Sequence, residues 1–328
     1  SYGFRPMRDT HQALARVTDL VFRTGYFWIV EGDISKCFDR LDHNVLIKRL
    51  YHMGIKDRRV LQIIKAMMKA GIIGECEVNE KGVQQGGVLS PLLANVSLDI
   101  LDQWITSQWE QKKTRFPYKD WKGKSEGLRK GSRLIPGYLV RYADDFVIIT
   151  DSREHAQSWK ERLQQYLQAE LKLELSPEKT LVKGKGLKGY IPRTLPDRNR
   201  LKRKVDAIAK ETKNIPYNYS REQVILAINR INSEIRGLIN YYSNCTWVNI
   251  AMKKYAHWLQ SIAMHRLKQY KGKWIPAKET RNLPRIHEKY KQKIPSIQYR
   301  DFYIGMTSLS FCKWEKPAVK HHEETPYT

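Results

Sequence analysis

Three aspartates in two separate stretches of the chain carry the side chains best suited to metal chemistry. Asp33 lies at the end of a stretch rich in β-branched and aromatic residues, and Asp144 and Asp145 are adjacent inside an apolar stretch. Carboxylate oxygens are ligands that Mg²⁺ prefers, and acids that converge from rigid elements can hold two such ions for phosphoryl transfer. Adjacent acids in apolar surroundings are otherwise unfavourable, because like charges repel and burial penalises both. The alternative is an exposed hairpin tip, where aspartate is common.

Local patterns predict the elements that must position these acids. Residues 26–34 are expected to form a strand that carries Asp33, and residues 138–150 a β-hairpin with the two adjacent acids at its turn. Asp42 is a predicted N-cap, and Pro91 fits the first turn of a helix. Helices are expected over residues 42–53, 60–70, 91–109 and 154–171.

The second half of the chain differs from the first in composition and charge. Residues 1–182 carry 29 Lys and Arg against 23 Asp and Glu, whereas residues 183–328 carry 30 against 11. Residues 110–137 are polar, basic and punctuated by glycine, which indicates a surface insertion, and residues 183–189 indicate a linker or a very tight loop. Between residues 221 and 243 apolar positions recur every three or four residues, which predicts one face of a long helix. A further helix is expected after it, and the periodicity then fades into basic, proline-containing sequence.

The net charge of +25 and the pI near 9.8 favour a polyanionic partner, with a solubilising surface as the alternative. Aromatic residues interleaved with the basic ones offer stacking platforms for bases. They are Trp247, Tyr255, Trp258, Tyr270, Trp274, Tyr290 and Tyr299. No window approaches the roughly 20 apolar residues that a membrane span needs, so no membrane partner is expected. The 4 cysteines lack CxxC spacing, which argues against a zinc site or a disulfide framework and fits a reducing, intracellular setting.

Six motifs, in the expected order, resemble those of reverse transcriptases. Residues 142–145, Tyr-Ala-Asp-Asp, resemble the YADD box, residues 32–39 resemble the first palm motif, and residues 175–180 resemble the palm motif after the box. Residues 85–91 resemble the QGxxLSP motif of the bacterial group II intron branch, and residues 1–13 resemble a finger segment of that branch. Residues 235–242 resemble the maturase, or thumb, domain. Together they resemble a bacterial group II intron-encoded protein, a reverse transcriptase and maturase. The chain is expected to be N-terminally incomplete and to lack a recognisable HNH nuclease domain.

The resemblance implies an α+β right-hand polymerase fold of fingers and palm, an all-α thumb or maturase domain, and a basic C-terminal extension. The implied domains are partial fingers at 1–28, the palm with remaining fingers elements and the basic insertion at 29–182, the helical thumb (maturase domain X) at 183–270, and a DNA-binding extension at 271–328. The implied activity is RNA-directed addition of dNTPs to a primer 3′-OH by a two-metal mechanism, with roles in intron splicing and mobility. Alternatives are an RNA-binding splicing cofactor that acts mainly as a maturase, or a stand-alone or CRISPR-associated reverse transcriptase.

The same resemblance implies partners and metal ligands. The partners would be a group II intron RNA, an RNA template, a DNA primer or target, and dNTPs, in the cytoplasm of a bacterial cell and with the oligomeric state left open. Asp33 and Asp144 would bridge two Mg²⁺ ions, for which Mn²⁺ could substitute. Asp145 would complete the carboxylate set, and Ile34 would offer its backbone carbonyl to one ion.

Further residues are implied to contact nucleotide or RNA. Phe38 would lie under the incoming sugar and exclude a 2′-OH, and the other nucleotide-binding candidates are Gln85, Gly86, Gly87, Arg5, Arg8 and Lys179. Alternatively, Phe38 is a core residue, the segment Gln85-Gly86-Gly87 is a simple glycine turn, Arg5 makes a structural hydrogen bond, and Lys179 is a solvated surface lysine. The RNA-binding candidates are Arg236, Tyr241, Tyr242, Lys202, Arg203 and Lys204, with a place in the helix core favoured for the first three. The strand that should follow Lys179 and hold the primer end is interpreted as missing.

Overall fold

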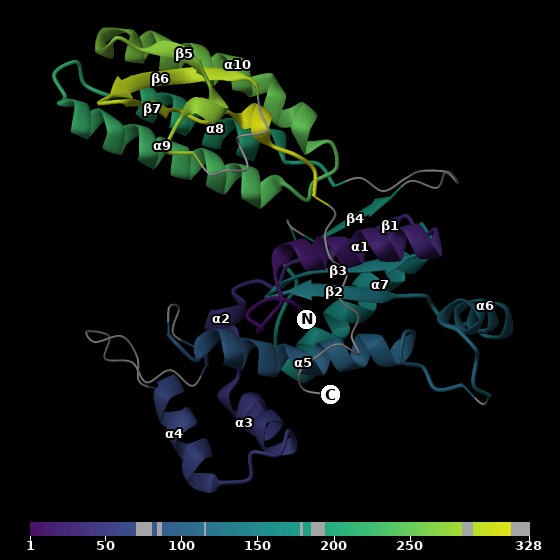
Figure 1. Ribbon diagram of the computed structural model, residues 1–328. Helices are drawn as coiled ribbons and strands as arrows, with labels where there is room; N and C mark the ends of the chain where they lie inside the picture. The colour runs from purple at the N-terminus through teal and green to yellow at the C-terminus, as the bar shows by residue number, and fades with distance from the viewer. Residues whose placement is uncertain are drawn as a thin grey trace. The chain divides into compact units, whose positions relative to one another are not determined.

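The chain folds into two compact units. The computed structural model describes residues 1–69, 81–83, 87–114, 116–177, 180–184, 194–283 and 291–315. The first unit lies within residues 1–192 and the second within residues 193–317 (Figure 1). Among the described helices, none combines the length and the apolar character that crossing a lipid bilayer would require.

The first unit is built on a four-stranded antiparallel sheet with the order β2-β3-β1-β4. Its strands are β1 (Trp28–Gly32), β2 (Tyr138–Tyr142), β3 (Asp145–Thr150) and β4 (Leu181–Gly184). β2 and β3 form a hairpin, and β1 pairs with β3 on one side and β4 on the other. The strand predicted over residues 26–34 and the hairpin predicted over residues 138–150 are therefore confirmed, although the strand is shorter than expected.

Helices cover both faces of this sheet (Figure 1). On one face Leu139 and Ile148 pack in a core with α5 (Ser90–Gln108) and α7 (Arg153–Tyr166). On the other face Val140 and its neighbours pack with α1 (Thr10–Thr24). Because successive strand residues point to opposite faces, a sheet covered on both sides needs apolar residues at consecutive positions, and these strands have them.

The remaining helices of the first unit include two that the sequence did not predict, at residues 37–40 and 121–131. They are α2 (Cys37–Arg40), α3 (His43–His52), α4 (Arg58–Lys69), α6 (Trp121–Gly131) and the π-helical turn η1 (Leu167–Leu171). Asp42 caps α3, as predicted, by accepting from the backbone N–H groups of Asn44 at 2.9 Å and Val45 at 3.1 Å.

Helix α6 lies inside the segment interpreted as a surface insertion. Two glycines hide it from sequence analysis, since glycine disfavours helix interiors. Asp120 caps its start by accepting from the backbone N–H of Gly123 at 2.7 Å. At Gly127 an added Cβ would lie 2.3 Å from the Tyr118 hydroxyl oxygen, so this glycine makes room for an aromatic side chain.

Strand β4 corrects the expectation that a strand after Lys179 is missing. It also contains residues 183 and 184, the first two of the segment 183–189 expected to be a linker or tight loop, while residues 185–189 lie outside the described residues. Gly184 pairs with Trp28 and Val182 with Val30. A Cβ at Gly184 would lie 2.5 Å from Cδ2 of Trp28, so glycine lets the indole pack directly against this strand.

The second unit begins with three helices, α8 (Arg198–Lys213), α9 (Arg221–Tyr242) and α10 (Val248–Leu267). The apolar face predicted for the long helix is confirmed, since every residue of it is buried: Val224, Ile228, Ile231, Ile235, Leu238 and Tyr242. Ser220 and Gln223 form a capping box at the start of α9. The repeat of three to four residues therefore predicted both the helix and the side that it buries.

The second unit also contains a three-stranded antiparallel sheet, which lies in the segment expected to be a basic C-terminal extension, after the helices of the expected thumb. Its strands are β5 (Lys273–Pro276), β6 (Lys293–Tyr299) and β7 (Phe302–Gly305), and short helical turns accompany them at η2 (Lys268–Tyr270), η3 (Ala277–Glu279) and η5 (Leu309–Phe311). Pro295 lies in β6, the central strand, where proline is normally absent. Ile297 and Ile304 on β6 and β7 join the helical core nonetheless.

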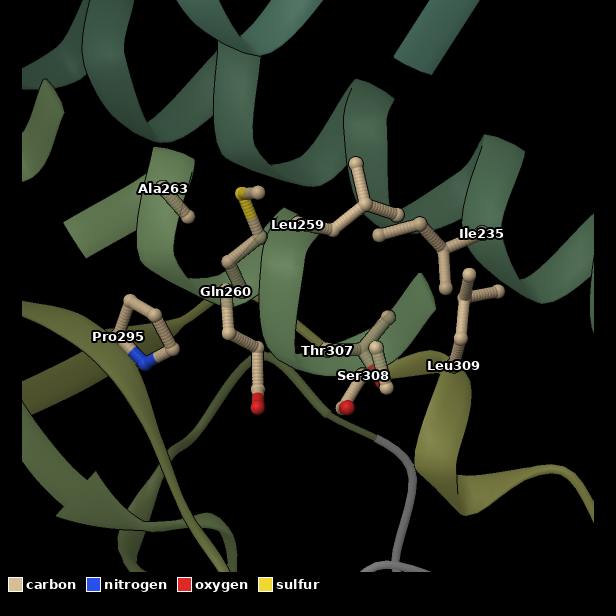
Figure 2. Close-up of a pocket in the computed structure, with 10 residues that line it drawn as sticks. Ile235, Leu259, Gln260, Ala263, Pro295, Thr307, Ser308 and Leu309 are labelled. Atoms are coloured by element: carbon tan, nitrogen blue, oxygen red, sulfur yellow. The ribbon is translucent and has the colours of Figure 1, made fainter. Parts of the chain in front are cut away.

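Polar and apolar contacts join this sheet to the helices (Figure 2). Ile235 of α9, Leu259 of α10 and Leu309 converge there and leave no room for a water molecule between them. The buried Asn232 side chain of α9 donates to the Gly305 carbonyl at 2.9 Å and accepts from the Thr307 N–H at 2.7 Å. Most buried apolar residues of the second unit therefore share one core, and Ala277, Ile294 and Phe311 form a second, smaller cluster.

Candidate active site

The two adjacent acids lie at a tight hairpin turn. Ala143 and Asp144 form the turn, and the flanking residues Tyr142 and Asp145 pair with each other. Ala143 has φ +58°, in the left-handed region that few residues other than glycine adopt. Two-residue hairpin turns require such a conformation. The carboxylate of Asp144 is half-buried and that of Asp145 is exposed, both at the end of the sheet.

Asp33 lies at the same end of the sheet. In the antiparallel register Gly32 faces Phe146, so Asp33 comes directly after β1 at the end where β3 begins with Asp145. The close approach explains the glycine: a Cβ at Gly32 would lie 2.3 Å from Cζ of Phe146. The register therefore brings the predicted acids from two distant stretches of the chain to the same end of the sheet.

A second segment holds Asp33 from the other side. The Asp33 carbonyl accepts from the Ser176 N–H at 2.8 Å, and the Ser35 N–H donates to the Glu174 carbonyl at 2.9 Å. Ile34 and Leu175 lie opposite each other between these two bonds. In such a pair the flanking residues make the hydrogen bonds, so the bridge does not use the Ile34 carbonyl.

The buried thiol of Cys37 lies within electrostatic range of both Asp33 and Asp144. Burial raises the pKa of Cys37 to about 12, and the charges of Asp144 and Asp33 both add to this effect, while Arg141 opposes it. At so high a pKa the thiol stays protonated at neutral pH, which makes it a poor nucleophile.

The donor types at this edge fit a divalent cation. Asp33, Asp144 and Asp145 supply hard carboxylate oxygens, and the Ile34 carbonyl is a further oxygen of the same kind. Like charges repel, and in the part of the chain that the structure describes no three His, Cys, Asp or Glu side chains are gathered as a metal-holding group. The structure thus places the donors at one edge without drawing three carboxylates onto one point.

Arg141, which sequence analysis did not single out, fixes the turn from beneath. Its side chain is 1% exposed and forms a bidentate pair with Asp102, at 2.7 Å from Nε and 2.8 Å from Nη2. Its Nη1 donates to the Asn95 side-chain oxygen at 3.1 Å and to the Ala143 carbonyl at 2.7 Å. The available signal was a charged residue at a strand position between apolar neighbours, immediately before the predicted turn.

The N-terminal segment packs against the same turn. The Tyr2 N–H donates to the Arg141 carbonyl at 2.8 Å, and Asn95 donates to the Gly3 carbonyl at 2.8 Å. A Cβ at Gly3 would lie 2.4 Å from the backbone nitrogen of Ala143. The glycine of the finger-like motif is therefore explained by contact with the turn that carries Asp144.

Arg5 and Arg8 lie in this N-terminal segment. Arg5 donates to the Ser1 carbonyl at 3.4 Å, which is the structural kind of hydrogen bond named as its alternative role. The Arg8 guanidinium lies 5.7 Å from the centroid of the Tyr2 ring. Both side chains are half-buried beside the turn, and their predicted contact with a triphosphate stays a prediction.

Phe38 and the glycine motif lie on a neighbouring element. Phe38 is half-buried and packs against the core of the first unit, which is compatible with both of its predicted roles. Its carbonyl accepts from the Val83 N–H at 2.8 Å, so residues 81–83 run along α2. The Gly87 carbonyl accepts from the Ser90 N–H at 3.2 Å where α5 begins. The predictions for Gln85, Gly86 and Lys179 fall outside the described residues.

The RNA-binding candidates of the second unit divide by exposure. Lys202, Arg203 and Lys204 are all exposed on α8. On α9 Tyr241 is 61% exposed, whereas Tyr242 is 9% exposed and belongs to the core because it continues the apolar face of the helix. Arg236, on the same helix, is half-buried and donates to Ser233 Oγ at 3.2 Å. The helix-core alternative therefore describes Tyr242, and Tyr241 presents its ring to solvent.

Two solved telomerase structures are distant matches. The apo telomerase of Candida Tropicalis matches with a TM-score of 0.42 at 13% identity, over 77% of this chain and 49% of that one. The telomerase of Candida albicans in complex with a TWJ fragment of telomeric RNA matches with a TM-score of 0.39 at 13% identity, over 80% and 49%. Similarities of this size do not assign a fold.

Sequence comparison gives closer matches. The family model described as reverse transcriptase (RNA-dependent DNA polymerase) matches residues 1–189. The group II intron-encoded protein LtrA of Lactococcus lactis subsp. cremoris is 30% identical, over 74% of this chain and 52% of that protein. Protein YkfC of Escherichia coli (strain K12) is 35% identical, over 56% of this chain and 51% of that protein. The chain thus spans about half the length of these curated relatives.

Proposed function

This chain belongs to the reverse transcriptase family, and we propose that it copies RNA into DNA as the reverse transcriptase of a group II intron. Membership supports a right-hand, polymerase-like fold, with the first unit as palm and part of the fingers and the helices of the second unit as thumb. The observation that carries the proposal is that Asp33 and the Asp144–Asp145 turn lie at the same end of the sheet. The similarity to group II intron-encoded protein LtrA supports the intron connection.

The reaction is an in-line phosphoryl transfer, in which a primer 3′-oxygen bonds to the α-phosphorus of a dNTP as pyrophosphate leaves. Two bound divalent ions, Mg²⁺ or Mn²⁺, would stabilise the charge on the attacking and leaving oxygens. Asp33 and Asp144 would hold these ions, with Asp145 and the Ile34 carbonyl completing the ligands. Arg141 keeps the turn in place by its bond to the Ala143 carbonyl.

The nucleotide would bind next to these acids. Phe38 would lie under its sugar and exclude a 2′-OH, so Phe38→Ala should admit ribonucleotides in primer extension, and unchanged sugar selectivity would count against this role. The segment of Gln85, Gly86 and Gly87 would line the base pair. Lys179, Arg5 and Arg8 would be the cations nearest the triphosphate, which a loss of affinity for dNTP on their substitution would test.

A maturase role is the second candidate, and the charge of the second unit favours it. Residues 193–317 carry 26 Lys and Arg against 9 Asp and Glu. Lys202, Arg203 and Lys204 lie exposed in succession on α8. We propose that this unit binds the folded intron RNA, with residues 271–328 contacting DNA. Replacing these three residues by glutamate should weaken RNA binding and reduce its salt dependence, and an unchanged salt dependence would contradict the assignment.

The decisive experiment compares aspartates at two hairpin turns. Asp144→Asn should lower primer extension on an RNA template with Mg²⁺ by on the order of 1,000-fold, because a charged ligand is lost. The matched control is Asp301→Asn at the turn between β6 and β7, which should leave extension unchanged. RNA affinity should be the same for both variants. Full extension by Asp144→Asn would refute the polymerase assignment.

A further inference from the structure

An open pocket of about 470 Å³ lies in the second unit, between the end of α8 and one side of α10. Three apolar or aromatic side chains line it, Tyr217, Trp258 and Ile262, together with the basic or titratable side chains of Lys213, His265 and Arg266. The α10 residues among them recur at helical spacing and therefore share one side of that helix. We call this site the Trp258 pocket.

Contacts within the protein already hold the walls of the Trp258 pocket. The guanidinium of Arg266 donates to the Lys213 carbonyl, and the Tyr270 hydroxyl donates to the Pro216 carbonyl. Both bonds fasten the loop that carries Tyr217 to α10 and the turn that follows it. The Arg266 guanidinium also lies 4.1 Å from the centroid of the Tyr217 ring. The pocket is therefore formed by the protein's own contacts, which lowers the entropy lost when a ligand binds.

The rings of the pocket remain available to a ligand. Tyr217 is 71% exposed and Trp258 is 42% exposed. An exposed indole beside an exposed phenol offers flat apolar surface that a planar ring can cover by stacking. Trp258 belongs to the aromatics that sequence analysis named as stacking platforms, and the structure distinguishes it by placing it in a preformed pocket with a second ring.

The charge around the pocket selects an anionic ligand. Lys213 and Arg266 are cationic and no acidic side chain is among the lining residues. Helix α10 contains no Asp or Glu along its 20 residues. A ligand with both planar rings and negative charges is a nucleotide strand. A double helix hides the faces of its bases, so the strand must be unpaired where it binds.

We propose that the Trp258 pocket binds an unpaired nucleobase of a single-stranded nucleic acid. The base stacks on Trp258, and Lys213 and Arg266 contact the neighbouring phosphates. The choice of nucleic acid as partner rests on the proposed function, while binding can be measured without polymerisation.

The first experiment measures the affinity of the full chain for a fluorescein-labelled oligouridylate of about 12 nucleotides by anisotropy at fixed salt. Trp258→Ala should weaken binding roughly tenfold, as loss of one stacked base predicts, and Trp258→Phe should retain most of the affinity. The matched control is Tyr51→Ala on α3 of the first unit, since Tyr51 is 46% exposed and does not line the pocket. Its affinity should stay within about twofold of the parent. Equal losses for both alanine variants would overturn the proposal.

The second experiment separates stacking from a structural effect. An oligonucleotide of the same length with abasic sites keeps its phosphates and loses its rings. The parent should bind it about tenfold more weakly than the intact strand, and Trp258→Ala should cause no further loss. If the variant loses the same factor on both strands, Trp258 does not contact a base and the proposal fails.

Three competitors define the ligand. Unlabelled single-stranded RNA should compete better than duplex RNA of the same sequence, and single-stranded DNA tested beside it identifies which strand the pocket prefers. A polyglutamate peptide of equal charge should compete poorly, and equal competition by it would assign the pocket to an acidic protein segment instead. The outcome is independent of catalysis: Asp144→Asn should bind the oligouridylate as the parent does, so either assignment can fail alone.

Discussion

Two β-hairpins among the described residues have the same turn in different surroundings. One joins β2 to β3 through Ala143 and Asp144, and the other joins β6 to β7 through Arg300 and Asp301. In both, the first turn residue has a left-handed φ, +58° and +50°, and the second is aspartate. In both, the side chain two residues earlier donates to the carbonyl of that first residue, from Arg141 in one and from Gln298 in the other.

What differs is how each donor is held. Arg141 is buried and bonds Asp102 and Asn95 of α5, far away in sequence. Gln298 is exposed, and its bond to the Arg300 carbonyl is 3.3 Å long. Aspartate at a hairpin tip therefore has no functional meaning by itself. Long-range contacts that fix the turn, together with a second acid at the same edge, distinguish a candidate active site from a surface hairpin.

The largest expected difference is between the two donors. Arg141→Ala should lower the free energy of unfolding by about 3–5 kcal/mol, because it leaves Asp102 without its buried partner. Gln298→Ala should change it by less than about 0.5 kcal/mol, as is usual at the surface. Urea unfolding of both variants measures the difference between these two changes in the free energy of unfolding.

A positioning role for Arg141 needs a readout beyond stability. Arg141→Lys keeps the charge and loses the bidentate geometry, so it should recover part of the stability while primer extension per folded molecule stays reduced. Similar unfolding curves for Arg141→Ala and Gln298→Ala would remove the distinction between the two hairpins.

Steric crowding of the turn between β2 and β3 should have the next largest effect on the free energy of unfolding. Gly3→Ala places a Cβ against the Ala143 nitrogen and should cost about 1–3 kcal/mol through overpacking, with weaker primer extension. The control is Gly237→Ala, where an added Cβ meets nothing within 4 Å and the helix should gain up to about 1 kcal/mol. Thermal unfolding compares them, and a harmless Gly3→Ala would show that the contact is dispensable.

Acid should lower the stability of the first unit through Asp42. Burial raises the pKa of Asp42, but hydrogen bonds from Lys172 and from the N–H groups of Val45 and Asn44 lower it to a net value below the usual 3.8. The folded state therefore prefers the ionised form. The ionised carboxylate of Asp42 stabilises the folded state by about 1 kcal/mol or less, because Lys172 is largely exposed. This stabilisation is present above pH 3.8 and is lost as the pH falls through the lower folded-state pKa.

Acid should act in the opposite direction on the second unit through Glu234. Burial raises the pKa of Glu234, and its neighbour Glu211 raises it further. The folded state then binds this proton more readily, so stability rises as the pH falls through the raised pKa. Hydrogen exchange of each unit in Asp42→Asn and Glu234→Gln between pH 6 and pH 3 tests the two signs. Equal slopes in the two variants would contradict them.

The smallest expected effect concerns what the hairpins share. Ala143→Gly and Arg300→Gly each remove the backbone strain of a non-glycine residue with a left-handed φ, but each also raises the conformational entropy of the unfolded chain. Each should change the free energy of unfolding by less than about 1 kcal/mol, and the two changes should agree. A much larger change at Ala143 in urea unfolding would mean that its side chain, and not only its carbonyl, fixes the turn.

The part of the structure that the sequence predicted is the part governed by neighbouring residues. The apolar repeat of α9 specified both the helix and its buried side, and the apolar flanks around Asp144 and Asp145 specified the hairpin. Asp42 was recognised as a cap because its partners are two and three residues away. In each case the forces act over one or two turns of chain.

The part that was missed depends on distant contacts. Strand β4 forms because Gly184 admits Trp28, some 150 residues earlier in the chain. β6 carries a proline that argues locally against a central strand. The network around Arg141 needs two partners from α5, and no spacing rule near the turn announces them. Sequence could name the acids, but not the cation that holds their turn.

Because Arg141 is bonded on both sides before any substrate arrives, the tip of the first hairpin is preorganised. Its conformational entropy is given up once, during folding, and does not have to be given up again each time a ligand binds. A turn that is already in place also limits how far Asp144 can move between one binding event and the next.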